Sequence, residues 1–363
     1  MDKDMMEGPG IMPVTENMRE VLNSRRHPGL CELRLTLGEL LAKNGFQARL
    51  TDEQKLGRVG SAVYRLSFKV NGEALSFVAK CLEPEVAQRN QLVVERWLPA
   101  VGLGHAGPPL VAIAADRHGR CVWHIYEDLG DWGLEEGNPD PERFAAVVEL
   151  LARLHGRFVG HPCLGACRLL GGDLGVHFFT ASVCDAMRSL EGLRPPSVRM
   201  SSDRSALRDR LLHRLGKFFA EQQERVRVIR ELGGPETLLH GDLWPQNALA
   251  IPAGEGFQVR LIDWDHAGVG PLAYDLSTFL SRIPVNQRRW ALDIYMQAPE
   301  GPEWVEPSVA GLNFLFETAE CARLANCVIW PAIAAWESGV EWAFDKMAEI
   351  DEWFEALAPL LPA

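Results

Sequence analysis

Apolar and polar residues alternate with a period of two in the first third of the chain. The apolar members of the first run are Tyr64, Leu66, Phe68 and Val70. A second apolar-rich run covers 75–82, and Asn71-Gly72 lies between the two runs. Period-two runs on either side of Asn-Gly are the strongest short-range signal for a β-hairpin, so this pattern predicts one.

Further elements flank this hairpin. The pattern predicts a short helix over 31–44, another helix over 90–98 and a strand over 121–126 that ends at Glu127-Asp128-Leu129-Gly130. The first 30 residues show no clear period. The region from residue 56 to residue 130 is therefore expected to be mostly sheet.

From residue 131 onward the pattern becomes helical. Asp140 is a preferred N-cap residue, and Pro141 suits the first position of a helix. The apolar face that follows comprises Phe144, Val147, Val148, Leu151 and Leu154. Another helix is predicted over 202–232, and three short strands are predicted over 237–239, 248–251 and 257–262. More helices are expected from there to the C-terminus.

Composition narrows the class of protein. The chain has 363 residues, and 37 basic against 49 acidic side chains give a net charge of −12. This length suggests about two domains. Sequence-independent binding to nucleic acid needs clustered Lys and Arg, so a nucleic-acid partner is not expected. No basic segment followed by an apolar stretch begins the chain, and no run of about 18 apolar residues occurs, so neither secretion nor membrane insertion is predicted. Eight scattered cysteines fit reduced thiols, which predicts a cytoplasmic location.

Polar residues gather at the ends of the short strands. The run His240-Gly241-Asp242-Leu243-Trp244-Pro245-Gln246-Asn247 follows the first of them, and Asp263 comes sixteen residues after Asn247, at the end of the third. Carboxylate and amide oxygens at one end of a small sheet suit Mg²⁺ and phosphate chemistry. Taken singly, each residue could equally be a turn or strand-end residue that satisfies local backbone groups.

Three upstream features occur in the order that a triphosphate site requires. A glycine turn, Gly57-Arg58-Val59-Gly60-Ser61, precedes the first hairpin strand, Lys80 lies on the second strand, and Glu95 lies on the following helix. Such a site needs backbone N–H groups over the phosphates, an ammonium group on them and a carboxylate that orients the ammonium. Each feature also has a purely structural interpretation, as a turn, an edge lysine or a solvated helix face.

Together these motifs resemble the aminoglycoside phosphotransferase and choline kinase family, over roughly residues 50–280. The resemblance implies a two-lobed protein-kinase-like α+β fold, with a small antiparallel-sheet N-lobe and a larger, mainly helical C-lobe. It divides the chain into a leader and helix over 1–45, a nucleotide-binding lobe over 46–130 that ends in a hinge, and a helical lobe over 131–363.

The same resemblance implies roles for the residues quoted above. Asp242 is similar to the catalytic aspartate that accepts the proton of the substrate hydroxyl, and Asn247 and Asp263 are similar to the Mg²⁺ ligands. Lys80 resembles the lysine that binds the nucleotide phosphates of ATP or GTP. His240 would brace the catalytic loop.

The remaining assignments concern the nucleotide. Glu95 is the expected partner of Lys80, although Glu83 and Glu85 also follow that lysine. The backbone of Glu127 to Leu129 resembles the hinge that binds the base. Gly60 and Ser61 are expected over the phosphates, although the glycine turn departs from the protein-kinase GxGxxG spacing.

A protein kinase is the obvious competing interpretation. Only twelve residues separate Asp263 from Asp275, which leaves no room for a long activation segment that would bind a peptide. The long helical stretch over 131–236 instead resembles the insertions that wall the substrate pocket of antibiotic kinases.

The acceptor is inferred from charge. Residues 301–363 contain eleven acids against Arg323 and Lys346, which predicts a negative wall that would attract a cationic, aminoglycoside-like substrate. A solvated acidic face is the alternative. Tryptophans in this region could stack on a sugar or enclose an ammonium group, or could belong to the core: Trp330, Trp336, Trp342 and Trp353.

Three functions remain open from the sequence. The first is a kinase of a small cationic molecule such as an antibiotic, and the second is a metabolic kinase of the choline or amino-sugar type. The third is a catalytically idle kinase-like protein that only binds nucleotide. The presence of Lys80, Asp242, Asn247 and Asp263 together favours an enzyme.

Overall fold

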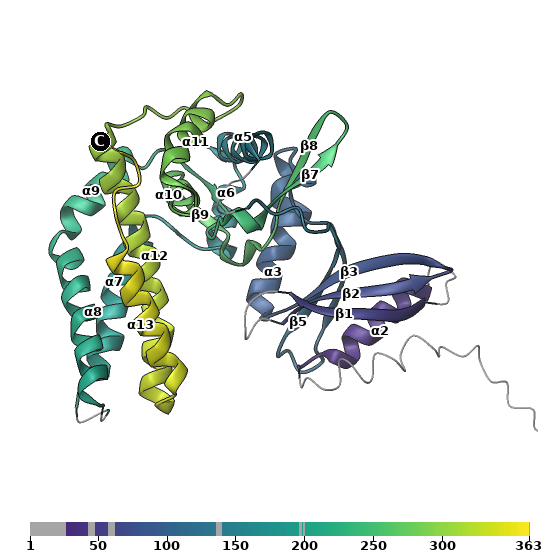
Figure 1. The fold of residues 1–363 in the computed structure, drawn as a ribbon, viewed down its shortest axis with the longest axis horizontal. Coiled ribbons are helices and arrows are strands. Elements are labelled where there is room, and N and C mark those ends of the chain that lie inside the picture. The colour runs from purple at the N-terminus through teal and green to yellow at the C-terminus, as the bar shows by residue number, and fades with distance from the viewer. Residues whose placement is uncertain are drawn as a thin grey trace, which may run out of the picture. The chain divides into compact units, whose positions relative to one another are not determined.

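The structure is a computed structural model that describes residues 27–42, 48–56, 62–135, 140–195, 198 and 200–362 (Figure 1). The chain forms two compact units, of which one ends at Asp131 and the other begins at Trp132. The predicted glycine turn over 57–61, with Gly60 and Ser61, lies outside the described residues.

The first unit contains an antiparallel five-stranded sheet in the order β1-β2-β3-β5-β4. Its strands are β1 (Ala48–Leu56), β2 (Val63–Val70), β3 (Glu73–Leu82), β4 (Leu110–Ala115) and β5 (Val122–Glu127). The predicted hairpin is confirmed as β2 and β3. Asn71 and Gly72 both have positive φ, 49° and 96°, as the tight turn between two twisted strands requires.

The core of this unit lies between the sheet and helix α2 (Leu30–Ala42). Alternate residues of β2 are buried, so the period-two pattern reports burial correctly. Leu33, Leu37 and Leu41, one helical turn apart, supply the helix side of this core.

The helix predicted over 90–98 begins earlier, at Pro84, as α3 (Pro84–Leu92). Proline at the first helical position starts it, because its fixed φ suits a helix and its missing N–H has no partner there. It continues into a π-helical turn, η1 (Val93–Trp97), and then α4 (Leu98–Ala100). Pro99 has no N–H to donate to the carbonyl of Glu95, four residues earlier, which interrupts the α-helical ladder at this turn.

The second unit begins with the most strongly predicted helix, α5 (Pro141–Phe158). The side chain of Asp140 accepts hydrogen bonds from the backbone N–H groups of Glu142 and Arg143, both at 3.0 Å, so the predicted N-cap is confirmed. The apolar face predicted for this helix is buried.

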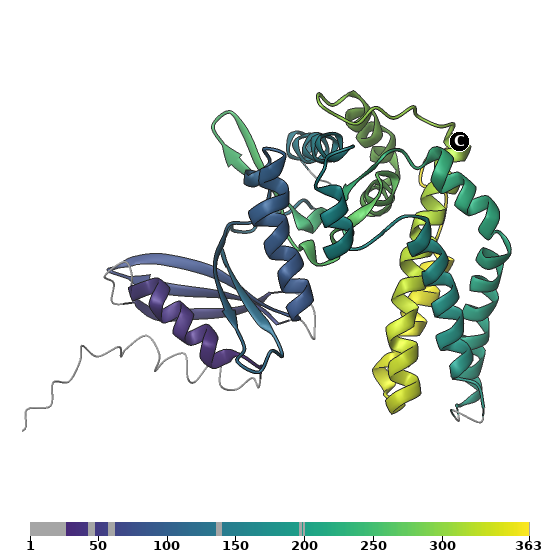
Figure 2. The ribbon, with the colours of Figure 1, turned by 180° about the vertical axis from the view of Figure 1, so that it is seen from behind.

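Most of the remaining second unit is helical. Its other helices are α6 (Leu164–Leu170), α7 (Val176–Gly192), α8 (Ser202–Ala220), α9 (Gln222–Leu232), α10 (Ala273–Ser281), α11 (Val285–Gln297), α12 (Val309–Ser338) and α13 (Glu341–Glu355). In both ribbon views α7, α8, α12 and α13 lie side by side, and their facing apolar residues form one core (Figures 1 and 2). Over the described part of the chain, no helix combines the length and apolar character that crossing a membrane requires.

The single helix predicted over 202–232 is wrong, because α8 and α9 are separate helices that meet at Glu221. The Glu221 carboxylate accepts two hydrogen bonds from Arg225, which is 97% buried and also reaches Glu317 and Thr318 on α12. This buried guanidinium fixes α9 against α12, whereas α8 packs on α7 and α13.

Four short strands connect the helices of this unit: β6 (Glu236–Leu239), β7 (Ala248–Ala253), β8 (Gly256–Leu261) and β9 (Gly268–Pro271). The first three are confirmed, with β7 and β8 paired as a hairpin. The strand β9, which pairs with β6, has the sequence Gly-Val-Gly-Pro, and such a sequence carries almost no strand signal. Its glycines allow close backbone approach, since a Cβ at Gly270 would lie 2.9 Å from the backbone of Leu174.

Candidate active site

A buried carboxylate fixes the loop that follows β6. Asp275, on α10, is fully buried and accepts the backbone N–H of His240 at 2.7 Å and that of Gly241 at 2.9 Å. Two hydrogen bonds from consecutive N–H groups to a charged acceptor hold the loop in one conformation. In the sequence, Asp275 served only to measure the spacing from Asp263, so its role in holding the loop was not predicted.

Two further buried side chains support Asp275. The Nε2 of His155, on α5, lies 3.4 Å from the Asp275 carboxylate, and its Nδ1 lies 2.7 Å from the hydroxyl of Tyr295, on α11. A carboxylate can only accept, so Nε2 carries the proton and Nδ1 accepts from the hydroxyl. Burial, with the charge of Asp275, raises the pKa of Tyr295 well above its ordinary value, so the phenol remains a donor.

Gly241 is required by the path of the loop. Its φ is +83°, and a Cβ at this position would lie 2.0 Å from the carbonyl oxygen of His266. Only glycine fits both conditions. The chain therefore turns sharply between His240 and Asp242, and the Asp242 side chain emerges from a backbone that Asp275 holds.

The loop is tied to the end of the β7–β8 hairpin. His240 donates from Nε2 to the carbonyl of Ile262 at 2.8 Å, and Ile262 donates its N–H to the carbonyl of Asn247 at 2.9 Å. The ring of His240 also packs on Trp264, with 4.7 Å between the centroids. These contacts link the loop that carries Asp242 to the residues on both sides of Asp263.

Hydrogen bonds to the backbone link the segments that carry Asp242, Asn247 and Asp263 in this region. The side-chain Nδ2 of Asn247 donates to the backbone carbonyl of Asp242 at 3.0 Å, and Asp263 directly follows Ile262, the backbone partner of Asn247. Asp263 has left-handed backbone angles, φ 67° and ψ 55°, which are costly for a residue with a side chain and concentrate at functional sites.

These side chains suit a hard cation. The N–H₂ group of Asn247 donates to Asp242, so the amide oxygen is the atom of this side chain that can bind a cation. Asp263 supplies a carboxylate. Oxygen donors of these two kinds are the ligands that Mg²⁺ prefers. The donor set therefore fits the metal that the sequence suggests.

In the first unit, Lys80 lies on β3 directly opposite His124 of β5. His124 is 99% buried, and burial together with the charge of Lys80 lowers its pKa to about 4. The imidazole is therefore neutral near neutral pH, and its Nδ1 contacts the hydroxyl of Tyr126 at 2.9 Å.

Glu95 lies in the π-helical turn, is exposed and accepts a hydrogen bond from Gln91 at 2.9 Å. Glu83 and Glu85, which follow Lys80 more closely, are exposed as well. The pairing of Lys80 with one of these glutamates stays a prediction. π-Helical turns are frequent at functional sites. In the sequence, this turn is marked by Pro99, which cannot donate the hydrogen bond of an α-helix.

The segment predicted as the hinge follows β5. The N–H of Glu127 donates to the carbonyl of Pro109 at 3.0 Å, and Leu129 lies between Asp128 and Gly130. Arg65 of β2 binds Asp128 at 2.8 Å and Asp131 at 2.7 Å, on both sides of Leu129. This clamp was not expected, because strand periodicity indicates only that Arg65 points away from the core.

Most acids of the predicted negative wall take part in ion pairs. Seven of its eleven acids form ion pairs with Arg or Lys: Glu306, Glu317, Glu320, Glu341, Glu349, Asp351 and Glu355. Most of the partners are arginines of α8, α9 and α11, which belong to the same unit. Trp330, Trp336 and Trp342 are 75%, 56% and 55% exposed, and therefore do not belong to the core.

Residues 59–312 match the family described as the phosphotransferase enzyme family, which is more than half of the chain. The chain belongs to this family. No curated protein sequence matches this chain.

Solved structures show the same fold. An aminoglycoside phosphotransferase bound to GDP and kanamycin is 16% identical, with a TM-score of 0.55, over 85% of this chain and 94% of that one. Plasmodium vivax ethanolamine kinase is 12% identical, with a TM-score of 0.59 over 98% of both chains. A choline kinase from Streptococcus pneumoniae is 13% identical, with a TM-score of 0.51 over 94% and 99%. The phosphotransferase thus has the predicted two-lobed kinase-like α+β fold, including the antiparallel sheet and the mainly helical remainder.

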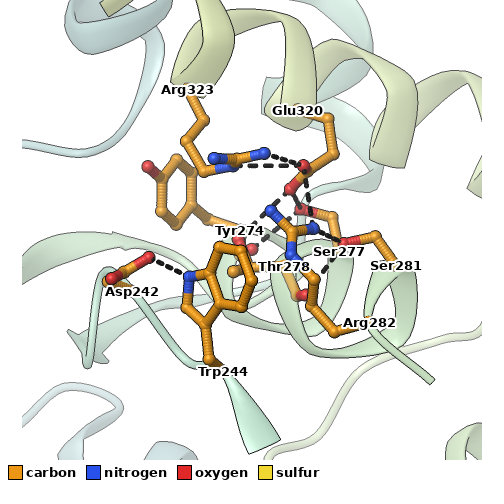
Figure 3. Close-up of polar contacts among 9 residues, drawn as sticks. All are labelled: Asp242, Trp244, Tyr274, Ser277, Thr278, Ser281, Arg282, Glu320 and Arg323. Atoms are coloured by element: carbon orange, nitrogen blue, oxygen red, sulfur yellow. Dashed lines mark hydrogen bonds and ion pairs between the residues drawn. The ribbon is translucent and has the colours of Figure 1, made fainter. Parts of the chain in front are cut away.

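A buried ion cluster lies in the helical unit beside the loop (Figure 3). Glu320, on α12, is 97% buried and binds Arg323 at 2.8 Å and Arg282 at 3.4 Å. Its other oxygen accepts hydrogen bonds from Ser277 and Thr278 of α10, at 3.4 Å and 3.2 Å. Burial alone would raise the pKa of Glu320, but the charges of Arg323 and Arg282 outweigh it and hold that pKa below its ordinary value.

Removing the charge of Glu320 should destabilise the protein strongly. Glu320→Gln leaves two largely buried guanidinium groups without their counter-ion, so we expect the free energy of unfolding near neutral pH to fall by about 3 kcal/mol in urea denaturation. Glu337→Gln, on the exposed face of the same helix, should change it by less than about 0.5 kcal/mol.

The same variant should alter the dependence of stability on pH. A carboxyl with a lowered folded-state pKa stabilises the protein above its unfolded pKa, and this contribution is lost as the pH falls through the folded value. Between about pH 5 and pH 3 the parent should therefore lose more stability than Glu320→Gln. Parallel curves for the two proteins would contradict the buried ion cluster.

Proposed function

We propose that the protein transfers the γ-phosphoryl group of ATP or GTP to a hydroxyl of a small molecule. The observation that carries this proposal is the meeting of Asp242, Asn247 and Asp263 at the end of the β7–β8 hairpin, on a loop held by Asp275. Membership in the phosphotransferase enzyme family supports it.

Asp242 is the catalytic residue of this proposal. Its carboxylate orients the acceptor hydroxyl toward the phosphorus and takes the hydroxyl proton as the new bond forms. Because the transition state of phosphoryl transfer is loose, positioning and electrostatics provide most of the rate enhancement, and a strong base is not needed. The fixed backbone on both sides of Asp242 serves this positioning.

The nucleotide is assigned to the remaining candidate residues. Asn247 and Asp263 would hold Mg²⁺, which neutralises the phosphate oxygens when it is bound. Lys80, oriented by Glu95, would bind the phosphates, Gly60 and Ser61 would cover them, and the backbone of Glu127 to Leu129 would bind the base. In this assignment residues 46–130 bind nucleotide, residues 131–363 bind the acceptor, and residues 1–45 form a leader and helix.

A cationic acceptor, such as an aminoglycoside-like antibiotic, is our first candidate. The exposed tryptophans of the tail could stack on a sugar or an ammonium group, and one structural neighbour was crystallised with kanamycin. The tail keeps its net negative charge, with eleven acids against Arg323 and Lys346, and this charge favours a cationic acceptor. A metabolic acceptor of the choline or amino-sugar type is the alternative, since other neighbours are choline and ethanolamine kinases.

The unpaired thiols of the eight cysteines support a cytoplasmic location.

Turnover should depend on Asp242. In a screen of kanamycin, spectinomycin, choline, ethanolamine and a ketosamine, we expect at least one acceptor to cause nucleotide consumption, and Asp242→Asn to lower this turnover by about 10²- to 10⁴-fold. The KM of the nucleotide should change little, because Asp242 touches the acceptor. The control is Asp185→Asn, an exposed aspartate of α7.

An outcome without any acceptor-dependent consumption, together with normal nucleotide binding, would favour an idle nucleotide-binding protein. Near-normal turnover of Asp242→Asn would remove Asp242 from the mechanism.

Nucleotide binding should depend on Asp263. In Asp263→Ala the charge of the triphosphate lacks its bridging ion, so Mg²⁺ with ATP or GTP should no longer raise the temperature of thermal unfolding as it does for the parent. Differential scanning fluorimetry with and without EDTA measures this effect. Equal protection of parent and variant would show that the metal assignment is wrong.

A further inference from the structure

The indole of Trp244 binds the carboxylate of Asp242 directly. Its Nε1–H donates to the Oδ1 of Asp242 at 2.6 Å (Figure 3). A hydrogen bond to a charged acceptor at this distance is among the stronger kinds in proteins. We propose that Trp244 is a positioning residue that orients the Asp242 carboxylate for phosphoryl transfer, an inference that rests on the catalytic role proposed for Asp242.

The carboxylate needs such a partner. Rotation about the terminal bond of an aspartate side chain has a broad, roughly two-fold preference, so the backbone of the loop alone does not fix where its oxygens point. The indole N–H occupies Oδ1 and thereby sets the plane of the carboxylate. The second oxygen, Oδ2, is then the one that can accept the hydroxyl of the acceptor.

The local backbone directs Trp244 to this task. The N–H of Trp244 donates to the carbonyl of Asp242 at 3.0 Å, which closes a tight turn between the two residues. Pro245 follows, and the residue before a proline is restricted to extended angles, as the φ of −88° and ψ of 151° at Trp244 show. The side chains of Asp242 and Trp244 are therefore brought together by the loop itself.

The face of the indole is held as well. The guanidinium of Arg282, at the C-terminal end of α10, lies 4.2 Å from the ring centroid. Arg282 is in turn bound to Ser281 and, at 3.4 Å, to Glu320. A planar cation over an indole is a favourable arrangement that also limits rotation of the ring.

The buried ion cluster described above therefore reaches the proposed catalytic residue. Glu320 takes charge-assisted bonds from Arg323 and Arg282 and hydroxyl bonds from α10, so its position is fixed by two helices. Figure 3 shows the chain of contacts from Glu320 through Arg282 and Trp244 to Asp242. Each link is a side-chain contact within the helical unit, and none requires a bound ligand.

Trp244→Phe removes the indole N–H but keeps an aromatic ring. Phenylalanine still offers a ring to Arg282 but cannot donate to Asp242. We expect kcat to fall by about 10- to 100-fold, the range for one hydrogen bond to a charged group, with little change in the KM of the nucleotide. Replacement of Trp244 by β-(3-benzothienyl)alanine, in which sulfur takes the place of the N–H, should have the same effect while it keeps the full ring surface.

Trp304→Phe is the matched control. Trp304 is also half-buried in the helical unit and donates from Nε1 at 3.0 Å, but its acceptor is the backbone carbonyl of Leu232. The change removes the same kind of group from the same kind of environment. Its kcat should stay within about two-fold of the parent, because the group that loses its hydrogen bond, the carbonyl of Leu232, is not part of the loop that carries Asp242.

The decisive readout is the coupling between Trp244 and Asp242. Turnover is measured with Mg²⁺ and ATP or GTP, and with the best acceptor of the panel or, where none is phosphorylated, with water. In an Asp242→Ala background Trp244→Phe should lower kcat by less than about two-fold, because the group that it orients is gone. An equal loss in both backgrounds, or normal turnover of Trp244→Phe, would overturn the inference.

A spectroscopic test needs no acceptor. In protein labelled with ¹⁵N at its 11 tryptophans, the indole signal that disappears in Trp244→Phe should shift upfield in Asp242→Ala, while the Trp304 signal stays in place. An unmoved Trp244 signal would overturn the inference. This test also decides the question when the residual turnover of Asp242→Ala is too low to measure. Normal turnover of Asp242→Ala would instead contradict the proposed function itself, which distinguishes the two failures.

Discussion

The buried carboxylate of Asp275 accepts hydrogen bonds from two consecutive backbone N–H groups, and the rest of the candidate site depends on this contact. It joins the first turn of α10 to a loop more than thirty residues earlier in the chain. A buried carboxylate without such donors would be strongly destabilising, so the loop and the helix each require the other. The positive φ of Gly241 and the hydrogen bond of His240 to Ile262 follow from the path that this contact imposes. Asp242, Asn247 and Asp263 meet because their backbones are fixed in this way.

Charge in the helical unit acts mainly through buried contacts. Glu320 and Arg225 are almost fully buried, and each is shared among partners on different helices. Such clusters add little net stability, but they penalise every arrangement in which a partner is missing, and so favour one packing of the helices. Of the acidic tail that suggested a substrate-attracting surface, only Glu317 and Glu320 belong to these two clusters, and the other paired acids form separate ion pairs. Three tryptophans of the tail, Trp330, Trp336 and Trp342, in contrast, are exposed, whereas Trp353 packs against the core of the helical unit.

The sequence predicted the elements that local patterns control. The alternation in β2, the Asn71-Gly72 turn and the Asp140 cap depend on neighbours in the chain, and the structure contains all three. Contacts between distant residues carry no local signal, which is why the roles of Asp275 and Arg65 were missed. The break at Glu221 was missed for the same reason, because it depends on the partners of Arg225 on α12. The family resemblance supplied the candidate residues, whereas the reason why they lie together is found only in the fold.

The central claim is that Asp275 holds the loop that carries Asp242, and amide hydrogen exchange tests it most directly. Asp275→Asn keeps the size of the side chain but leaves a single oxygen to accept two N–H groups. We expect the amides of His240 and Gly241 to exchange at least about ten-fold faster than in the parent, since one lost hydrogen bond to a charged group opens the loop. Exchange in α12 should stay the same. Unchanged exchange at His240 and Gly241 would contradict the account.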